Sequence, residues 1–280
     1  MRRSLDGMTY HVRARGDGPP LLLLHGFTGS SQTWDPFLAR FAARFRVLAV
    51  DLPGHGRTDA PRDPERYAAE RLVADLLALL DALDAPRARV LGYSLGGRLA
   101  LHLAVTAPER VAALVLESAS PGIAEPDQRA TRVREDEALA NDLEHNGIQA
   151  FVDRWERLPL WASQARLPAA ERARLRAQRL AQRPEGLANS LRGFGAGRPR
   201  PLHSELGRLT MPVLVLAGAD DERYVTVGRA MAAGIPNARF DIVPEAGHAV
   251  HLEQPGRFAK LALDFLTSEI QTIGAGGRTP

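Results

Sequence analysis

Short apolar runs alternate with longer amphipathic stretches along most of this chain. Six runs rich in apolar and β-branched residues predict strands, at 21–24, 47–50, 90–91, 111–116, 213–216 and 240–243. Between them, apolar residues recur at three- and four-residue spacings and predict helices at 34–44, 66–83, 97–107, 225–233 and 252–266. The strand runs lack polar alternation, which is typical of strands covered on both faces. The pattern therefore predicts an α/β fold with a mostly parallel sheet.

This alternation stops between residues 121 and 209, where arginine-rich helical stretches such as 129–143 and 168–181 replace the strand-like runs. The segment also carries apolar and aromatic residues that can pack onto the sheet: Phe151, Trp155, Leu158, Leu160 and Trp161. We therefore expect a core formed by residues 1–120 and 210–268, with a helical cap inserted at 121–209. The glycine-rich end, 269–280, is expected to be a disordered tail.

Composition narrows the class of protein. The 280 residues include no cysteine, which excludes disulfides and thiolate metal sites, and we find no motif for a metal or an organic cofactor. No apolar run approaches the ~18 residues of a membrane span. We expect a soluble, cytoplasmic protein that does not bind membranes, either as a monomer or as a small homo-oligomer.

Charge points to a small anionic ligand. The net charge of +3 arises from 36 basic and 33 acidic residues that are interspersed, a pattern that does not favour nucleic acid as a partner. Lys260 is the single lysine, so the other basic residues are arginines. Arginine binds carboxylates and phosphates in a bidentate manner, so some of these side chains are candidates for anion recognition.

A serine between glycines follows the third predicted strand, in the segment Gly-Tyr-Ser-Leu-Gly-Gly at 92–97. This pattern predicts a nucleophile elbow, in which Ser94 exposes its hydroxyl at a sharp turn between strand and helix. Such a serine needs a histidine to accept its proton and a carboxylate to orient that histidine.

Acid and histidine candidates follow in the order that this kind of site requires, each after a later strand. Asp220 and Asp221 compete for the acid role, since spacing does not separate them, and both are also candidates to cap the next helix. His248 competes with His251, and the preceding Gly247 favours His248 because it indicates a loop.

Two backbone N–H groups are candidates for an oxyanion hole. One belongs to Leu95, directly after the serine, and the other to Phe27 in the loop His-Gly-Phe-Thr-Gly that follows the first predicted strand. The alternative for this loop is an ordinary glycine turn. A second strand-to-loop segment, 51–56, is expected to shape the site, with His55 in a structural role.

Arg98 stands four residues after Ser94, so both side chains share one face of the predicted helix. A guanidinium one turn from the reactive hydroxyl favours an anionic substrate. The alternative is a structural ion pair with Glu117 or Asp136.

Several motifs together resemble the α/β-hydrolase fold superfamily over residues 10–266: 25–27, 51–56, 92–97 and 247–248. Further segments resemble the SHCHC synthase family of menaquinone biosynthesis, called MenH: 117–123, 190–193 and 247–253. The resemblance implies that Ser94, Asp221 and His248 form a catalytic triad.

The resemblance also implies a reaction and a substrate. SHCHC synthases eliminate pyruvate from a cyclohexene that carries a ring carboxylate, a succinyl chain and an enolpyruvyl ether. Family positions for binding its carboxylates correspond to Arg98, Arg132 and Arg179, and aromatic positions correspond to Tyr93, Trp155 and Trp161. In the arginine-rich cap, four neighbours are alternatives to the last two arginines: Arg129, Arg134, Arg176 and Arg183.

Our leading hypothesis is therefore a lyase in which Ser94, activated by His248, abstracts a proton and the oxyanion hole stabilises the enolate. A hydrolase that uses the same three residues, either a carboxylesterase or a carbon–carbon bond hydrolase, is the alternative. A non-catalytic receptor on the same fold is a third class, and the intact serine, acid and histidine argue against it.

Overall fold

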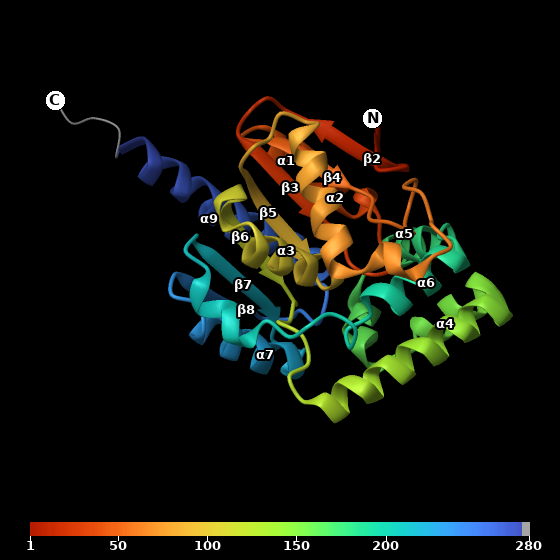
Figure 1. Cartoon of the computed structure of the whole chain (residues 1–280). Helices are drawn as coiled ribbons and strands as arrows, with labels where there is room; N and C mark the ends of the chain where they lie inside the picture. Colours follow the sequence, from red (N-terminus) through yellow and green to blue (C-terminus); the bar gives the residue numbers. More distant parts are fainter. Residues whose placement is uncertain (276–280) are drawn as a thin grey trace.

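An eight-stranded sheet forms the centre of the molecule (Figure 1). Its order is β1-β2-β4-β3-β5-β6-β7-β8; β2 runs antiparallel to its neighbours, and β3 to β8 pair in parallel. The strands are β1 (Arg2–Leu5), β2 (Met8–Arg15), β3 (Pro20–Leu24), β4 (Arg46–Val50), β5 (Ala88–Tyr93), β6 (Val111–Glu117), β7 (Val213–Gly218) and β8 (Ala238–Val243). This computed structural model describes residues 1–275, with side chains through residue 268.

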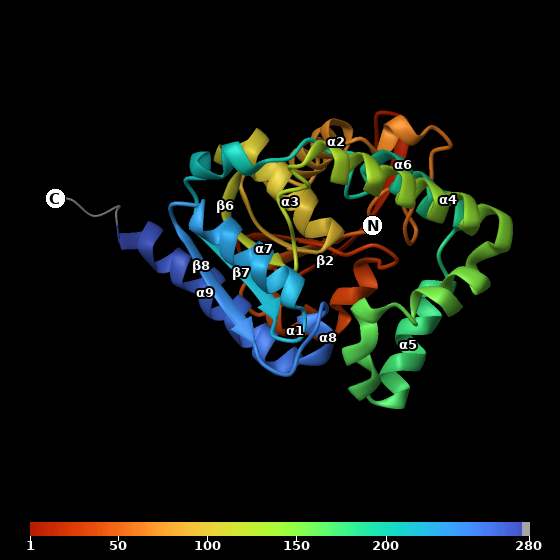
Figure 2. The same ribbon diagram turned by 90° about the horizontal axis from the view of Figure 1, so that it is seen from below.

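Helices cover both faces of the sheet (Figure 2). Successive side chains of a strand point to opposite faces, so Leu22 and Leu24 of β3 pack on one side, and Leu21 and Leu23 on the other. The first face is covered by α2 (Ala69–Asp81), α3 (Leu95–Thr106) and α7 (Glu222–Ala233), and the second by α1 (Asp35–Ala42) and α9 (Pro255–Ala275). Coverage of both faces explains why these strands are apolar throughout.

A helical cap is inserted between β6 and β7. It consists of α4 (Pro126–Trp155), the 3-10 helix η4 (Pro159–Arg166), α5 (Ala169–Leu180) and α6 (Pro184–Phe194). Gly147, with φ of 76°, interrupts α4. A small core of its own includes Leu143, Phe151 and Leu187. The cap lies at the end of the sheet to which the arrows of β3, β5 and β7 point (Figure 1).

The six predicted strands and the five predicted core helices are present, with bounds that shift by a few residues except at the end of α9, which continues to Ala275. The sequence analysis missed β1, β2 and α6. In β2, buried and partly exposed residues alternate because this antiparallel strand lies near the edge of the sheet. Within the described range, no helix is long and apolar enough to cross a membrane.

The predicted tail begins at residue 269, and α9 continues to Ala275. The remainder of that segment, 276–280, lies outside the described residues.

Candidate active site

Ser94 occupies a strained turn between β5 and α3. Its φ of 50° and ψ of −109° lie outside the usual regions for a residue with a side chain. The flanking glycines are needed for close approach: a Cβ on Gly92 would lie 2.4 Å from the Gly96 carbonyl oxygen, and one on Gly96 would lie 2.4 Å from that of Leu24. The Ser94 N–H donates to the Glu117 carbonyl at 2.8 Å. The turn therefore has the geometry of a nucleophile elbow.

A chain of hydrogen bonds links Ser94 to His248 and Asp221. Ser94 Oγ lies 3.0 Å from His248 Nε2, and His248 Nδ1 lies 2.7 Å from Asp221 Oδ2. A carboxylate can only accept, so Nδ1 carries the proton and Nε2 of the neutral ring is left to accept from the serine hydroxyl. The structure thus brings together three residues from the ends of three different strands.

The competing acid and histidine have other partners. Asp220 is exposed and forms an ion pair with Arg166 of the cap. His251 is buried and hydrogen bonded to Glu117 at 2.8 Å. Asp221 also accepts from the Tyr224 N–H at 3.2 Å, so it caps α7 as well as holding the histidine. Of the four candidate residues, Asp221 and His248 are the two in the hydrogen-bond chain to Ser94.

The loop after β3 lies beside the elbow. Gly29 N–H donates to the Gly26 carbonyl at 3.0 Å, which forms a tight turn around Phe27. Within the described chain, the Phe27 N–H donates no hydrogen bond. Leu95 is the first residue of α3, and first-turn N–H groups have no partner inside their helix. Both predicted oxyanion donors are therefore available to an acceptor.

Arg98 is buried and forms no ion pair within 4 Å among the side chains that the structure describes, although Asp136 lies near enough to raise its pKa. Its Nη2 donates to the Phe194 carbonyl at 2.9 Å, and its guanidinium lies 4.9 Å from the centre of the Phe194 ring. Both acids that we considered as partners bind elsewhere: Glu117 binds His251, and Asp136 binds Arg132 at 2.8 Å. Burial lowers the pKa of Arg98 to about 10, which leaves the side chain charged at neutral pH.

The other predicted arginines belong to the cap. Arg132 is partly exposed and paired with Asp136. Arg179 is buried: its Nη1 donates to Glu156 at 3.0 Å and its Nη2 to Gln164 at 3.2 Å. Burial lowers the pKa of Arg179. Its guanidinium also lies 5.4 Å from the centre of the Trp161 ring, so it is held on several sides.

The four alternative arginines differ in their surroundings. Arg134 is exposed and donates to Thr131, and Arg183 donates to the Thr58 carbonyl. Arg176 pairs with Asp153 and Glu156, and no ion pair of Arg129 is found in the described region. None of these side chains is as buried as Arg179.

Aromatic rings surround the histidine. The ring centres of Tyr93 and Trp161 lie 5.6 and 5.5 Å from that of His248. Trp155 contacts Trp161 at 5.7 Å and Phe27 at 5.5 Å, so it lies one ring further away. The sequence analysis missed Tyr224, whose ring lies 4.6 Å from His248. No spacing signal identifies this residue, because its position depends on how α7 packs.

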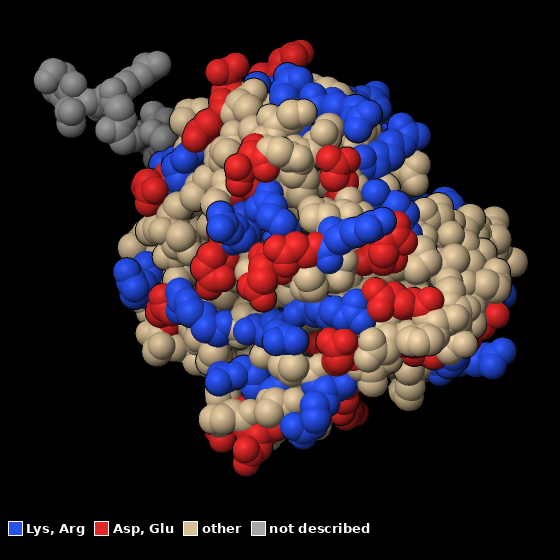
Figure 3. Space-filling model, turned by 45° about the vertical axis from the view of Figure 1, so that its right-hand side comes forward, with Lys and Arg blue, Asp and Glu red and all other residues tan. Residues whose placement is uncertain are grey.

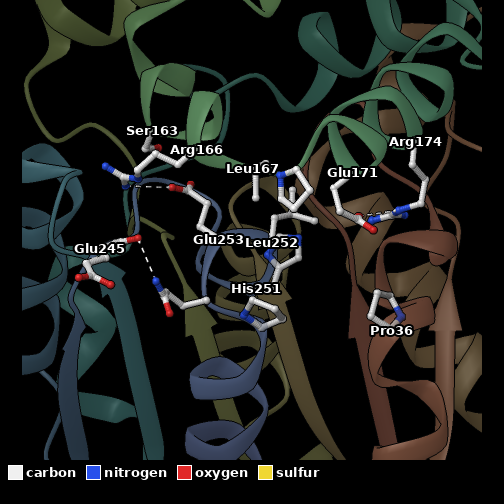
Figure 4. A pocket seen from close by; sticks show the side chains of 13 residues that line it. Pro36, Ser163, Arg166, Leu167, Glu171, Arg174, Glu245, His251, Leu252 and Glu253 are labelled. Atoms are coloured by element: carbon white, nitrogen blue, oxygen red, sulfur yellow. Dashed lines mark hydrogen bonds and ion pairs between the residues drawn. The ribbon is translucent and has the colours of Figure 1, made fainter.

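Two cavities meet this region. A small one of about 30 Å³ lies between the Gly26–Gly29 loop and the cap, and Tyr93, Trp161 and Arg179 contribute to its wall. A larger one of about 550 Å³ opens between the start of α5 and the segment around α8 (Val250–Glu253) (Figure 4). His251 contributes to the walls of both. Figure 4 also shows the Arg166 side chain directed toward Glu253, 3.6 Å away.

Comparison with known proteins places this fold and site in a family. A family model described as the alpha/beta hydrolase fold matches residues 19–255. The chain belongs to the α/β-hydrolase fold family. This confirms the superfamily that the sequence motifs indicate.

Within that family, this α/β-hydrolase is similar to MenH. A Bacillus subtilis (strain 168) protein, provisionally named 2-succinyl-6-hydroxy-2,4-cyclohexadiene-1-carboxylate synthase, is 43% identical over 265 residues, covering 94% of this chain and 96% of the relative. The solved structure of MenH from S. aureus is 35% identical, covers 93% of this chain and 98% of that chain, and has a TM-score of 0.89. A Variovorax paradoxus (strain S110) protein, provisionally named carbamate hydrolase RutD, is 35% identical over 266 residues, covering 92% of this chain and 95% of the relative.

Proposed function

We propose that this protein is a 2-succinyl-6-hydroxy-2,4-cyclohexadiene-1-carboxylate synthase, a lyase that eliminates pyruvate in menaquinone biosynthesis. The observation that carries the proposal is Arg98. A buried cation without an acidic partner is unfavourable unless a ligand supplies the anion. Arg98 lies one helical turn from Ser94, so a carboxylate bound there brings the substrate to the reactive hydroxyl. The similarity to MenH supports the same reaction.

The hydrogen-bond chain supplies the base for this elimination. His248 Nε2 draws the proton from Ser94 Oγ, and the serine oxygen in turn removes the proton beside the succinyl ketone. The N–H groups of Phe27 and Leu95 stabilise the enolate oxygen that develops. Collapse of the enolate breaks the carbon–oxygen bond to the enolpyruvyl group, which takes up the proton and leaves as pyruvate. No acyl-enzyme forms.

Arginines account for recognition of a substrate with three carboxylates. Arg98 binds one carboxylate beside the elbow, while Arg132 and Arg179 reach the others from the cap. Both cap residues must then exchange a protein partner for the substrate, since Asp136 and Glu156 hold them in this structure. Tyr93, Trp155 and Trp161 form the aromatic wall against the cyclohexene ring.

The experiment supplies the enolpyruvyl cyclohexene substrate and measures pyruvate with a coupled lactate dehydrogenase assay. We expect pyruvate equal in amount to the substrate consumed. Ser94→Ala is expected to lose about a thousandfold or more in kcat, because removal of such a nucleophile disables the whole hydrogen-bonded unit. A wild-type protein that releases no pyruvate would refute the proposal.

A hydrolase is the second candidate, because the relative at 35% identity bears a hydrolase name and a Ser–His–Asp arrangement also serves ester hydrolysis. Cleavage of p-nitrophenyl acetate, measured in parallel, separates the two. Rapid ester turnover without pyruvate release favours the hydrolase.

A further inference from the structure

A second buried acid–histidine pair, Glu117 and His251, lies close to Ser94 and His248. Glu117 ends β6, and His251 lies in α8, three residues after His248. Their side chains are 0% and 1% exposed, and the proposed chemistry uses neither. One carboxylate oxygen, Glu117 Oε1, accepts the His251 backbone N–H at 2.9 Å and its Nδ1–H at 2.8 Å.

Glu117 contacts both halves of the reactive arrangement. Its carbonyl oxygen accepts the Ser94 N–H at 2.8 Å, and its side chain holds the short helix that follows the His248 loop. The His251 ring packs edge-on against Tyr93, with ring centres 4.5 Å apart, and Tyr93 in turn lies 5.6 Å from His248. Glu117 and the His251 ring therefore connect the elbow of Ser94 to the loop of His248.

Stability alone does not account for a buried acid–histidine pair at this position. Burying a carboxylate is unfavourable without compensation, and apolar residues of similar volume often replace a buried ion pair with equal or higher stability. An apolar pair, however, lacks directional hydrogen bonds. Two N–H bonds to one oxygen fix both the position of α8 and the rotation of the His251 ring.

We infer that Glu117 and His251 are positioning residues that set the distance between Ser94 Oγ and His248 Nε2. The inference rests on the serine–histidine chemistry of the proposed function but not on its substrate. Small misplacements of reacting groups reduce rates steeply, so loss of the pair slows every reaction of Ser94.

The experiment measures the rate at which a fluorophosphonate labels Ser94, together with the urea midpoint of unfolding. This probe needs only the activated serine, so it reports on positioning even if the lyase assay fails. His251→Phe removes the ring donor and leaves Glu117 Oε1 with only the backbone N–H of residue 251. The double variant Glu117→Leu/His251→Phe removes both polar side chains, and Glu117→Gln keeps an acceptor oxygen in the same place.

The double variant distinguishes a positioning role of Glu117 and His251 from a role in packing alone. We expect His251→Phe to label about tenfold more slowly and to unfold at lower urea. The double variant should recover much of the urea midpoint and yet remain about tenfold slow, while Glu117→Gln labels within about threefold of wild type. A double variant that labels at the wild-type rate would show that the pair only fills space.

A destabilised control and a reserve variant complete the design. Tyr10→Phe breaks the buried 2.7 Å hydrogen bond to Asp75 on the other side of the fold and should lower the urea midpoint without slowing labelling. If the double variant does not fold, His251→Gln replaces it, because its amide keeps a donor for Glu117 but lacks the ring against Tyr93. Labelling about fivefold slower supports the inference, and unchanged labelling overturns it.

Discussion

The buried guanidinium of Arg98 is an unfavourable feature of the free protein, retained beside the reactive serine. Arg98→Met fills similar space without the charge. We expect its free energy of unfolding to rise by about 1 kcal/mol, because the wild-type side chain forms no ion pair in the described region. The kcat/KM for pyruvate release should fall about 100-fold, the size of a lost hydrogen bond to a charged group.

Urea unfolding and the pyruvate assay check both parts of this prediction. Arg134→Met is the matched control, since Arg134 is an exposed arginine of the cap, and it should change neither quantity appreciably. If Arg98→Met is less stable than wild type, the Phe194 carbonyl and ring already compensate the charge, and the argument for a ligand at this position fails.

Adjacent aspartates offer a sharp test of the hydrogen-bond chain. Asp221→Asn keeps the size of the side chain but no longer favours the His248 ring with its proton on Nδ1, so kcat should fall about 10⁴-fold, as in other serine–histidine–aspartate sites. Asp220→Asn breaks only an exposed ion pair with Arg166 and should retain nearly full activity. Equal losses in the two variants would contradict the assignment of Asp221.

At the level of elements, the sequence could predict the helices and strands in which apolar residues recur at one regular spacing. The strand and helix runs of the core are such segments, and the elbow, the acid and the histidine each follow a strand that these runs predict. Side-chain partners across the cap could not be predicted in this way. Whether Arg132 or Arg134 is the more enclosed depends on which face of α4 turns inward. Which of Asp220 and Asp221 contacts His248 depends in the same way on how α7 packs.

The turn after helix α5 makes a contact that no local pattern indicates. There Gln182 donates to the Gly29 carbonyl at 3.1 Å and accepts from the Gly56 N–H at 2.9 Å, so the cap holds the loop that carries Phe27. Gln182→Leu leaves both backbone groups unpaired. We expect a loss of about 2 kcal/mol in unfolding free energy and about tenfold in kcat.

Hydrogen exchange localises this effect. Amides of residues 26–33 should exchange faster in Gln182→Leu, whereas those of β5 and β6 should not. Gln149→Leu, an exposed glutamine of α4, serves as the control for the substitution itself. Unchanged exchange in the loop would mean that the core alone fixes the oxyanion donors.

Across the whole molecule, surface charges are mixed while several histidines are buried. Figure 3 shows basic side chains beside acidic ones over one face, which is consistent with the small net charge of +3. Inside, burial lowers the pKa of His55 to about 3 and that of His102 to about 4. We therefore expect the change in stability at acidic pH to come largely from these buried histidines.

The direction in which stability changes with pH follows from the number of protons that the folded and unfolded states bind. Below a pH of about 6.5 the unfolded chain protonates His102, whereas the folded protein does so only near its pKa of about 4. The unfolded state thus binds more protons in this window, and stability falls as pH falls through it. For His102 alone, the free energy of unfolding should drop by about 2 kcal/mol between about pH 8 and about pH 5. His102→Leu should reduce the pH dependence of the urea-derived free energy by that amount, and an unchanged slope in this variant would show that His102 already titrates normally in the folded protein.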